Sequence, residues 1–182
     1  SVLARKFEGD NPVLIYLPEV AFDQDVFLKD LEKAFEKNCN LIVCVSEGIH
    51  DADGTFICEY DSSVGTDTFG HKMLAGCGKY LENLVRSRLG VKARSVELNV
   101  SQRCSASLIS ATDQKEAITA GKFGVQAALN GETGKMVSFI RQTDSEGNYQ
   151  MVCGLEDVNA ICNEEKTVPV EWITPDGHDV TE

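Results

Sequence analysis

Two short apolar runs with an amphipathic stretch between them dominate the start of the chain. Residues 13–17 and 41–45 are apolar almost throughout, which is typical of parallel strands that are covered on both faces. Apolar side chains recur at the helical period between residues 27 and 35, and Asp23 can cap that helix. A strand, a helix and a strand in this order predict one βαβ unit.

The alternation of helices and strands continues through the middle of the chain. Apolar positions between 74 and 85 predict a helix that Gly90 ends, and the alternating residues 93–100 predict a central strand. Residues 112–128 predict a further helix, with Asp113 as its cap. That helix carries a face of small residues that would let a sheet or a partner helix approach closely, namely Ala117, Gly121, Gly124 and Ala128.

A β-hairpin is predicted near the C-terminus. Residues 136–141 and 149–153 are strand-like and flank a polar turn at 144–148, and a short helix around 155–161 follows. Residues 48–69, by contrast, are polar and indicate a long insertion-like loop. These elements together predict an α/β fold, and we expect residues 1–182 to form a single α/β domain.

Composition and charge narrow the classes of function. The chain has 182 residues, enough for one domain with a sizeable core. Its formal net charge of −12 disfavours nonspecific binding to nucleic acid or to an anionic membrane surface. No stretch approaches the length of a membrane span or has the character of a signal peptide. Phosphate ligands remain compatible with this charge, because a few arginines can dominate one cleft.

The cysteines favour a reduced, cytoplasmic protein. There are seven of them, without a C-x-x-C pair and without the spacing of a zinc site of two Cys and two His. Cys44 and Cys153 lie inside apolar runs, where a thiol behaves as a small hydrophobic side chain.

Three charged residues lie at the ends of predicted strands, where α/β proteins often bind ligands. Glu47 follows the second predicted strand at its carboxyl end, the edge where open α/β sheets bind ligands. Its carboxylate is either simply solvated or an acceptor for sugar hydroxyls. Arg94 and Arg103 lie near the two ends of the predicted central strand. They are either surface arginines or phosphate ligands, since a guanidinium can donate two parallel hydrogen bonds to a phosphate.

A series of motifs extends along nearly the whole chain in a fixed order. They are residues 13–22 with Pro18-Glu19, residues 41–48 with Glu47, Phe69-Gly70-His71, Arg94 with Arg103 nine residues later, residues 131–137 and residues 168–173. As an ordered set they resemble the phosphofructokinase family, most closely its pyrophosphate-type branch. The implied fold is a Rossmann-like, three-layer α/β domain with a mostly parallel sheet, helices on both faces and a hairpin near the C-terminus.

The resemblance implies a function for the three charged residues. Glu47 would bind the sugar and Arg103 the phosphate of fructose 6-phosphate, whereas Arg94 would reach the phosphate bound by a neighbouring subunit. This implies a homodimer or a larger homo-oligomer. The implied reaction is that of a glycolytic 6-phosphofructokinase, which makes fructose 1,6-bisphosphate with pyrophosphate or ATP as donor.

The resemblance also implies that part of the enzyme lies outside this chain. The motifs match the substrate side, a C-terminal half, of a two-domain enzyme. The donor site, the catalytic residues and most of the Mg²⁺ site would lie in a first half, so no catalytic residue and no metal ligand is expected here. The opening residues Ser1–Lys6, which have the pattern of a helix tail without a start Met, also indicate a fragment. We therefore expect this chain alone to be inactive.

At two places this sequence departs from the pattern of the ATP-dependent branch of the family. Bacterial ATP-dependent enzymes have His at the place of Val100 and Gly-Gly-Ser-Pro in place of residues 104–107. The first departure favours the pyrophosphate type, and the second leaves Ser107 without a role.

Two other classes of function stay open at this stage. One is a non-catalytic α/β module that binds an anionic metabolite. The other is a cysteine hydrolase that uses Cys104 or Cys77 with a His distant in sequence. His71, near the start of a predicted helix, is either a surface residue or a ligand or base.

Overall fold

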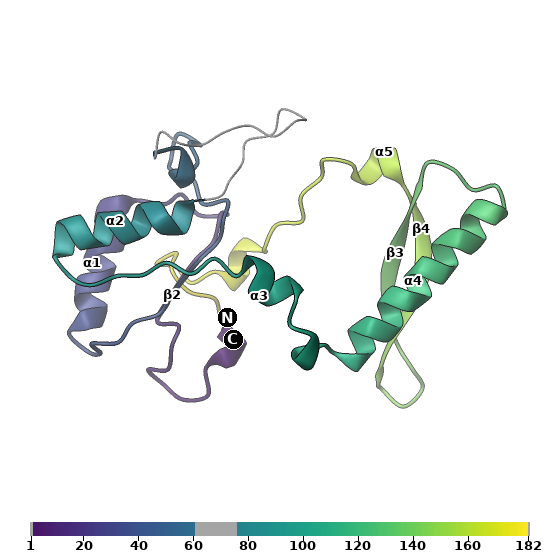
Figure 1. The fold of residues 1–182 in the computed structure, drawn as a ribbon, viewed down its shortest axis with the longest axis horizontal. Helices are drawn as coiled ribbons and strands as arrows, with labels where there is room; N and C mark the ends of the chain where they lie inside the picture. Colours follow the sequence, from purple (N-terminus) through teal and green to yellow (C-terminus); the bar gives the residue numbers. More distant parts are fainter. Residues whose placement is uncertain (1, 61–75, 182) are drawn as a thin grey trace. The chain divides into compact units, whose positions relative to one another are not determined.

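The computed structural model describes residues 2–60 and 76–181 and shows two compact units (Figure 1). Unit 1 consists of Ser1–Glu97 with Thr167–Glu182, and unit 2 of Leu98–Lys166. The motif Phe69-Gly70-His71 and most of the predicted loop 48–69 lie outside the described residues. Whether the two units make one domain stays a prediction.

The predicted βαβ unit forms the centre of unit 1. Strands β1 (Leu14–Tyr16) and β2 (Val43–Val45) pair in parallel, and helix α1 (Gln24–Phe35) connects them. Asp23 caps α1 as predicted, because one of its carboxylate oxygens accepts hydrogen bonds from the amides of Asp25 and Val26 at 2.8 and 2.9 Å.

Helix α2 (Cys77–Leu89) covers the same core and ends at Gly90, as predicted. Gly90 has φ of 67°, the left-handed conformation that glycine adopts without a Cβ penalty. Short 3₁₀ turns occur in unit 1 at Val2–Ala4, Ile57–Tyr60 and Val170–Trp172.

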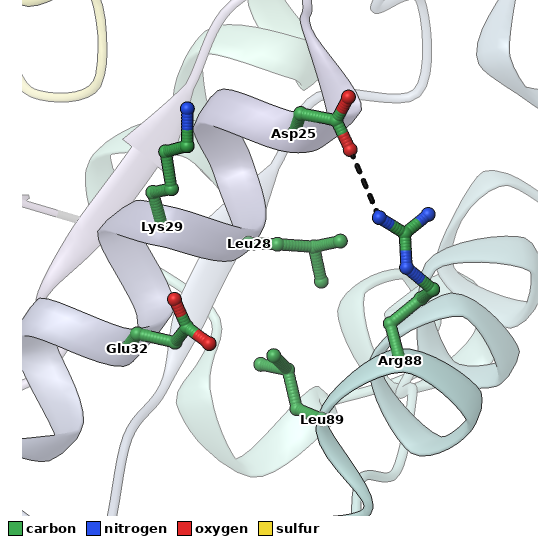
Figure 2. A pocket seen from close by; sticks show the side chains of 6 residues that line it. All are labelled: Asp25, Leu28, Lys29, Glu32, Arg88 and Leu89. Atoms are coloured by element: carbon green, nitrogen blue, oxygen red, sulfur yellow. Dashed lines mark hydrogen bonds and ion pairs between the residues drawn. The ribbon is translucent and has the colours of Figure 1, made fainter.

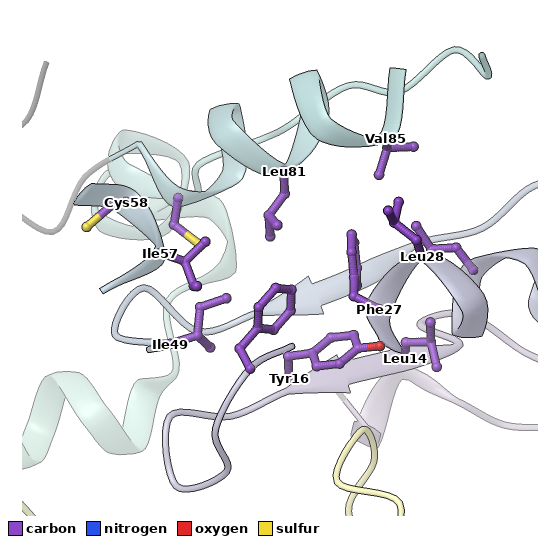
Figure 3. Close-up of a cluster of buried hydrophobic side chains, with 12 residues drawn as sticks. Leu14, Tyr16, Phe27, Leu28, Ile49, Ile57, Cys58, Leu81 and Val85 are labelled. Atoms are coloured by element: carbon purple, nitrogen blue, oxygen red, sulfur yellow. The ribbon is translucent and has the colours of Figure 1, made fainter. Parts of the chain in front are cut away.

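The core of unit 1 lies between the strands and the two helices (Figure 3). Its aromatic centre consists of Tyr16, Phe22 and Phe27, whose ring centroids lie 5.3–5.4 Å apart. Aliphatic and thiol side chains from α1, α2 and the turn after β2 complete it, including Leu28, Ile49, Ile57, Cys58, Leu81 and Val85. Burial of each such side chain contributes about 1.5–3 kcal/mol, so this cluster holds the strands in place.

The C-terminal end of the described chain contacts β1, and the N-terminal end contacts the C-terminal end. The amide of Ile15 donates to the carbonyl of His178 at 2.8 Å, and Arg5 contacts both carboxylate oxygens of Asp179 at 2.8 and 2.9 Å. The buried carboxylate of Asp30 accepts from the Tyr16 hydroxyl at 3.2 Å and lies 3.2 Å from the Nδ1 atom of His178. Burial, followed by the charge of Asp30, raises the pKa of Tyr16 above its ordinary value, so the phenol stays protonated as the donor.

Unit 2 contains the predicted helix and the predicted hairpin. Helix α4 (Ala111–Leu129) lies across strands β3 (Lys135–Thr143) and β4 (Tyr149–Asp157), which pair antiparallel with Lys135 opposite Asp157 (Figure 1). Ser110 caps α4, three residues before the predicted cap Asp113, because its hydroxyl accepts from the amide of Asp113. The remaining elements are short: α3 (Asn99–Arg103), a 3₁₀ turn at Ala106–Leu108 and α5 (Val158–Ile161).

The predicted central strand over residues 93–100 is wrong. Residues 91–98 have no strand partner in the part of the chain that the structure describes, and α3 begins at Asn99. The backbone amide and the hydroxyl of Ser95 both donate to the carboxylate of Glu82, at 2.9 and 2.8 Å, in place of a neighbouring strand. The α/β class, the parallel strands and the hairpin near the C-terminus are confirmed, and the parallel sheet has two strands in the described part of the chain.

Among the residues that the structure covers, no helix combines the length and the apolar character needed to cross a bilayer.

Candidate functional site

The carboxyl ends of β1 and β2 form one edge, and Glu47 lies there as predicted. The amide of Ser46 donates to the carbonyl of Tyr16 at 2.9 Å, so the chain leaves both strands at the same level. A Cβ at Gly48 would lie 3.8 Å from the Cβ of Pro18, which is ordinary contact. The loops that follow β1 and β2 are therefore side by side, and Glu47 projects from the second of them.

The Glu47 side chain is exposed and makes no hydrogen bond or ion pair with another described residue. Its charge nevertheless acts on the two buried cysteines nearby. Burial, then the charges of Cys58, Glu47 and Glu97, raise the pKa of Cys77 to about 12. Burial is also the first cause of the raised pKa of Cys58. Both thiols thus stay protonated near neutral pH.

The properties of the cysteines allow the alternative function, a cysteine hydrolase, to be assessed. A nucleophilic cysteine needs a lowered pKa and access to substrate, and Cys77 has neither. Cys104 is exposed, but residues 98–166 contain no His that could serve as its base within unit 2. The structure therefore gives no support to this class.

Glu19 is a second carboxylate at the same edge, which the sequence reasoning did not single out as a site residue. One of its oxygens accepts from the amide of Val168 at 2.7 Å, and the other is buried without a partner among the described residues. The signal that could have identified it is its position, since Glu19 follows β1 as Glu47 follows β2. Glu19 thereby joins the C-terminal part of unit 1 to the strand edge.

Arg94 is exposed because its two neighbours are fixed on the protein side. Ala93 packs against the core, and Ser95 is held by Glu82 of α2. A Cβ at Gly78 would lie 3.2 Å from the Cβ of Ser95, so the segment runs close along the helix. Arg94 itself makes no hydrogen bond or ion pair with a described residue. Its guanidinium is therefore exposed to solvent.

Glu82 is the anchor of this segment. The hydrogen bond from Lys79, followed by those from the amide and hydroxyl of Ser95, lowers the pKa of Glu82 to about 2. Lys79 and Arg86 lie 2.7 and 3.3 Å from one of its oxygens, while the other oxygen accepts from Ser95. The ionised carboxylate thus links two cations on α2 to the segment that carries Arg94.

Arg103 is the last residue of α3, not the end of a strand as predicted. The amide of Cys104 donates to the carbonyl of Val100 at 2.8 Å and closes this single turn. The Arg103 side chain is exposed and has no partner among the described residues. Glu47 and Arg94 belong to unit 1 and Arg103 to unit 2, so a joint role of the three stays a prediction.

A separate hollow of about 310 Å³ lies between α1 and α2 (Figure 2). It is lined by Asp25, Leu28, Lys29, Glu32, Arg88 and Leu89. Arg88 lies 3.1 Å from Asp25, as the dashed line in Figure 2 marks, and two carboxylates balance its two cations. This balance makes the hollow a poor phosphate site. The described residues also contain no group of three or more His, Cys, Asp or Glu side chains that could hold a metal ion.

No family model matches the chain, but individual relatives match all of it. A pyrophosphate–fructose 6-phosphate 1-phosphotransferase of Rhodospirillum rubrum is 36% identical over 100% of this chain and 45% of the relative. The Methylococcus capsulatus protein of the same name is 34% identical over 99% of this chain and 42% of the relative.

A solved structure agrees with these relatives. The pyrophosphate-dependent phosphofructokinase of Nitrosospira multiformis superposes with a TM-score of 0.72 at 28% identity, over 99% of this chain and 40% of that one. The chain thus spans less than half the length of the proteins that it matches.

Proposed function

The chain belongs to the phosphofructokinase family, and from this premise we propose that it is the sugar-phosphate-binding part of a pyrophosphate-dependent 6-phosphofructokinase. The observation that carries the proposal is similarity over the entire chain to proteins of that name. The proposed reaction transfers a phosphoryl group from pyrophosphate to fructose 6-phosphate, which yields fructose 1,6-bisphosphate. ATP is the alternative donor, because an ATP-dependent 6-phosphofructokinase of Streptomyces coelicolor is 35% identical over 71% of this chain.

The proposed roles follow from the chemistry of the exposed groups. Glu47 accepts hydrogen bonds from sugar hydroxyls at the strand edge, since its carboxylate is exposed and has no partner within residues 2–60 and 76–181. Arg103 donates to the 6-phosphate, and Arg94 donates to the phosphate of a substrate bound by a neighbouring subunit, which requires a homodimer or a larger homo-oligomer. These groups bind and orient the acceptor and leave its reacting hydroxyl free.

Charge neutralisation during phosphoryl transfer is usually supplied by Mg²⁺. The described residues of this chain contain no cluster that would hold the ion. We propose that Mg²⁺ and the phosphoryl donor are bound mainly by the part of the enzyme that this chain does not match, which is more than half of the length of the relatives. All seven cysteines are free thiols, which supports a reducing, cytoplasmic setting.

Binding of the acceptor tests the proposal. The protein to use is a chimera in which this chain replaces the matching part of the Rhodospirillum rubrum relative. Calorimetric titration with fructose 6-phosphate should show saturable binding that is weakened by Glu47→Ala, with Glu32→Ala of α1 as the matched control. Equal affinity for fructose 6-phosphate and inorganic phosphate would favour a non-catalytic anion-binding module instead.

A further inference from the structure

The direction of the Arg94 side chain depends on the backbone that carries it, because the side chain has no partner among the described residues. That backbone is held one residue further on, where Ser95 meets α2. The amide and the hydroxyl of Ser95 donate to the same carboxylate oxygen of Glu82, at 2.9 and 2.8 Å. One donor belongs to the main chain and the other to the side chain, so this single acceptor fixes both parts of Ser95.

The amide that Glu82 binds belongs to the peptide unit that begins at the Cα atom of Arg94. A peptide unit is planar, so a bond to its N–H group restricts the rotation about the preceding Cα–C bond, which is that of Arg94. On the other side, Ala93 packs against the core. Exposure alternates accordingly: residues 91, 93 and 95 are half-buried, and residues 92, 94 and 96 are exposed. Arg94 is thus held on both sides and points outward.

Helix α2 keeps Glu82 itself in place. Lys79 and Arg86, three residues before it and four after it, lie 2.7 and 3.3 Å from the carboxylate oxygen that Ser95 does not use. The Glu82 side chain is only 10% exposed, so water competes little for this carboxylate. Because buried residues of α2 anchor the helix on the core, a continuous series of contacts leads from the core through Glu82 to Arg94.

The segment also lies too close to α2 to take up many positions. A Cβ built on Gly78 would lie 3.2 Å from the Cβ of Ser95, which is tighter than ordinary contact. The missing side chain at Gly78 therefore lets Ser95 reach Glu82. A shielded charge of this kind adds less stability than apolar packing would, but it specifies one geometry.

We propose that Glu82 is a positioning residue of the acceptor site: through Ser95 it directs the guanidinium of Arg94 toward the phosphate of fructose 6-phosphate bound by a neighbouring subunit. This inference rests on the proposed function and adds to it a residue that touches no substrate. A planar guanidinium makes two parallel hydrogen bonds to a phosphate only over a narrow range of directions. A segment without this contact would present Arg94 in many directions and bind the phosphate more weakly.

Calorimetric titration of the Rhodospirillum rubrum chimera with fructose 6-phosphate tests the proposal. Glu82→Ala and Ser95→Ala should each weaken binding about three- to tenfold, the factor that one lost hydrogen bond represents. Ser95→Ala keeps Glu82 and the amide contact, so it serves if the charge substitution prevents folding. The matched controls are Glu32→Ala on α1 and Ser87→Ala, which removes a hydroxyl that donates to the carbonyl of Leu84 at 3.0 Å. Both controls should bind as the unaltered chimera does.

A double variant separates positioning from a general effect on the fold. In the Arg94→Ala chimera, fructose 6-phosphate should still bind, more weakly, through the remaining contacts. Adding Glu82→Ala to this chimera should cause no further loss, because no guanidinium is left to direct. A residue that only stabilised the fold would weaken binding by the same factor in both backgrounds.

Subunit exchange provides a second readout, measured as activity. Glu82→Ala and Glu47→Ala chimeras are mixed in equal amounts, so that the hybrid site with an intact Glu47 receives Arg94 from a subunit with an intact Glu82. If the defect of the Glu82→Ala homodimer is about fivefold, the rate at fructose 6-phosphate far below KM should rise about threefold on exchange, because half of the dimers are hybrids. An unchanged rate despite demonstrated exchange would overturn the proposal.

The binding experiment separates failure of this inference from failure of the proposed function. Weaker binding in Arg94→Ala, together with unchanged binding in Glu82→Ala and Ser95→Ala, would overturn the inference and leave the role of Arg94 intact. Equal losses from Glu82→Ala in both backgrounds would also overturn it, since Glu82 would then act without Arg94. Unchanged binding in Arg94→Ala would overturn both the inference and the proposed role of Arg94.

Discussion

Arg103 ends α3 with an exposed guanidinium that has no partner among the described residues. Its proposed role is to bind the phosphate of fructose 6-phosphate. A hydrogen bond to a charged group is worth about 1.5–3 kcal/mol, so Arg103→Ala in the chimera should raise KM for fructose 6-phosphate about tenfold or more. The matched control is Arg141→Ala, which removes an arginine that lies over the ring of Tyr149 on the hairpin. Steady-state kinetics measure both variants, and an unchanged KM for Arg103→Ala would refute the role.

For single residues, the sequence predicted the position of a charged side chain better than it predicted the contacts of that side chain. Glu47 was placed correctly because two residues after the end of a parallel strand is an edge position in any α/β sheet. Glu19 has the equivalent place after β1 but was not singled out, since its contact with Val168 joins residues 149 positions apart. A contact of that range leaves no periodic signal in the sequence.

Among the helices and strands, the sequence pattern correctly predicted the features that depend on interactions between residues close in the chain. Asp23 caps α1, Gly90 ends α2 and the polar turn joins β3 to β4, each through contacts within a few residues. The prediction of a central strand was wrong because an alternation of apolar and polar residues does not by itself provide a partner strand. The apolar positions Val96 and Val100 are 78% and 69% exposed, and Ser95 bonds to Glu82 of the preceding helix.

The Glu82 contact predicts an acid-sensitive stabilisation of the Arg94 segment. Its pKa is lowered from 4.5, the ordinary value that the unfolded chain retains, to about 2 in the folded protein. The stabilisation is therefore fully present above about pH 4.5 and is lost as the pH falls through about 2. Glu82→Ala should flatten this part of the pH profile of unfolding free energy and speed hydrogen exchange at the Ser95 amide.

The control for that experiment is Glu32→Ala, which removes an exposed carboxylate of α1. It should leave both the pH profile and the Ser95 exchange rate unchanged. Urea denaturation between about pH 2 and pH 6 measures the first, and native-state hydrogen exchange the second. An equal effect of the two substitutions would mean that the contact with Ser95 is not what stabilises the segment.

In the whole molecule, the proposed role of Arg94 requires that neighbouring subunits share a site. Arg94→Ala and Glu47→Ala chimeras should each be inactive or nearly so. Mixed in equal amounts and allowed to exchange, they should recover about a quarter of wild-type activity, because half of the dimers are hybrids with one intact site of two. No recovery despite demonstrated exchange would mean that Arg94 acts within its own subunit or not at all.

The most direct test of the central claim is the rate at which fructose 1,6-bisphosphate forms from fructose 6-phosphate, pyrophosphate and Mg²⁺. The proposed function predicts no turnover by this chain alone, because the chain spans less than half the length of the phosphotransferases that it matches. It predicts pyrophosphate-dependent turnover by the Rhodospirillum rubrum chimera, and a large loss when Glu47 and Arg103 are both replaced by Ala. Turnover by the chain alone, or a chimera whose rate is indifferent to both replacements, would contradict the account.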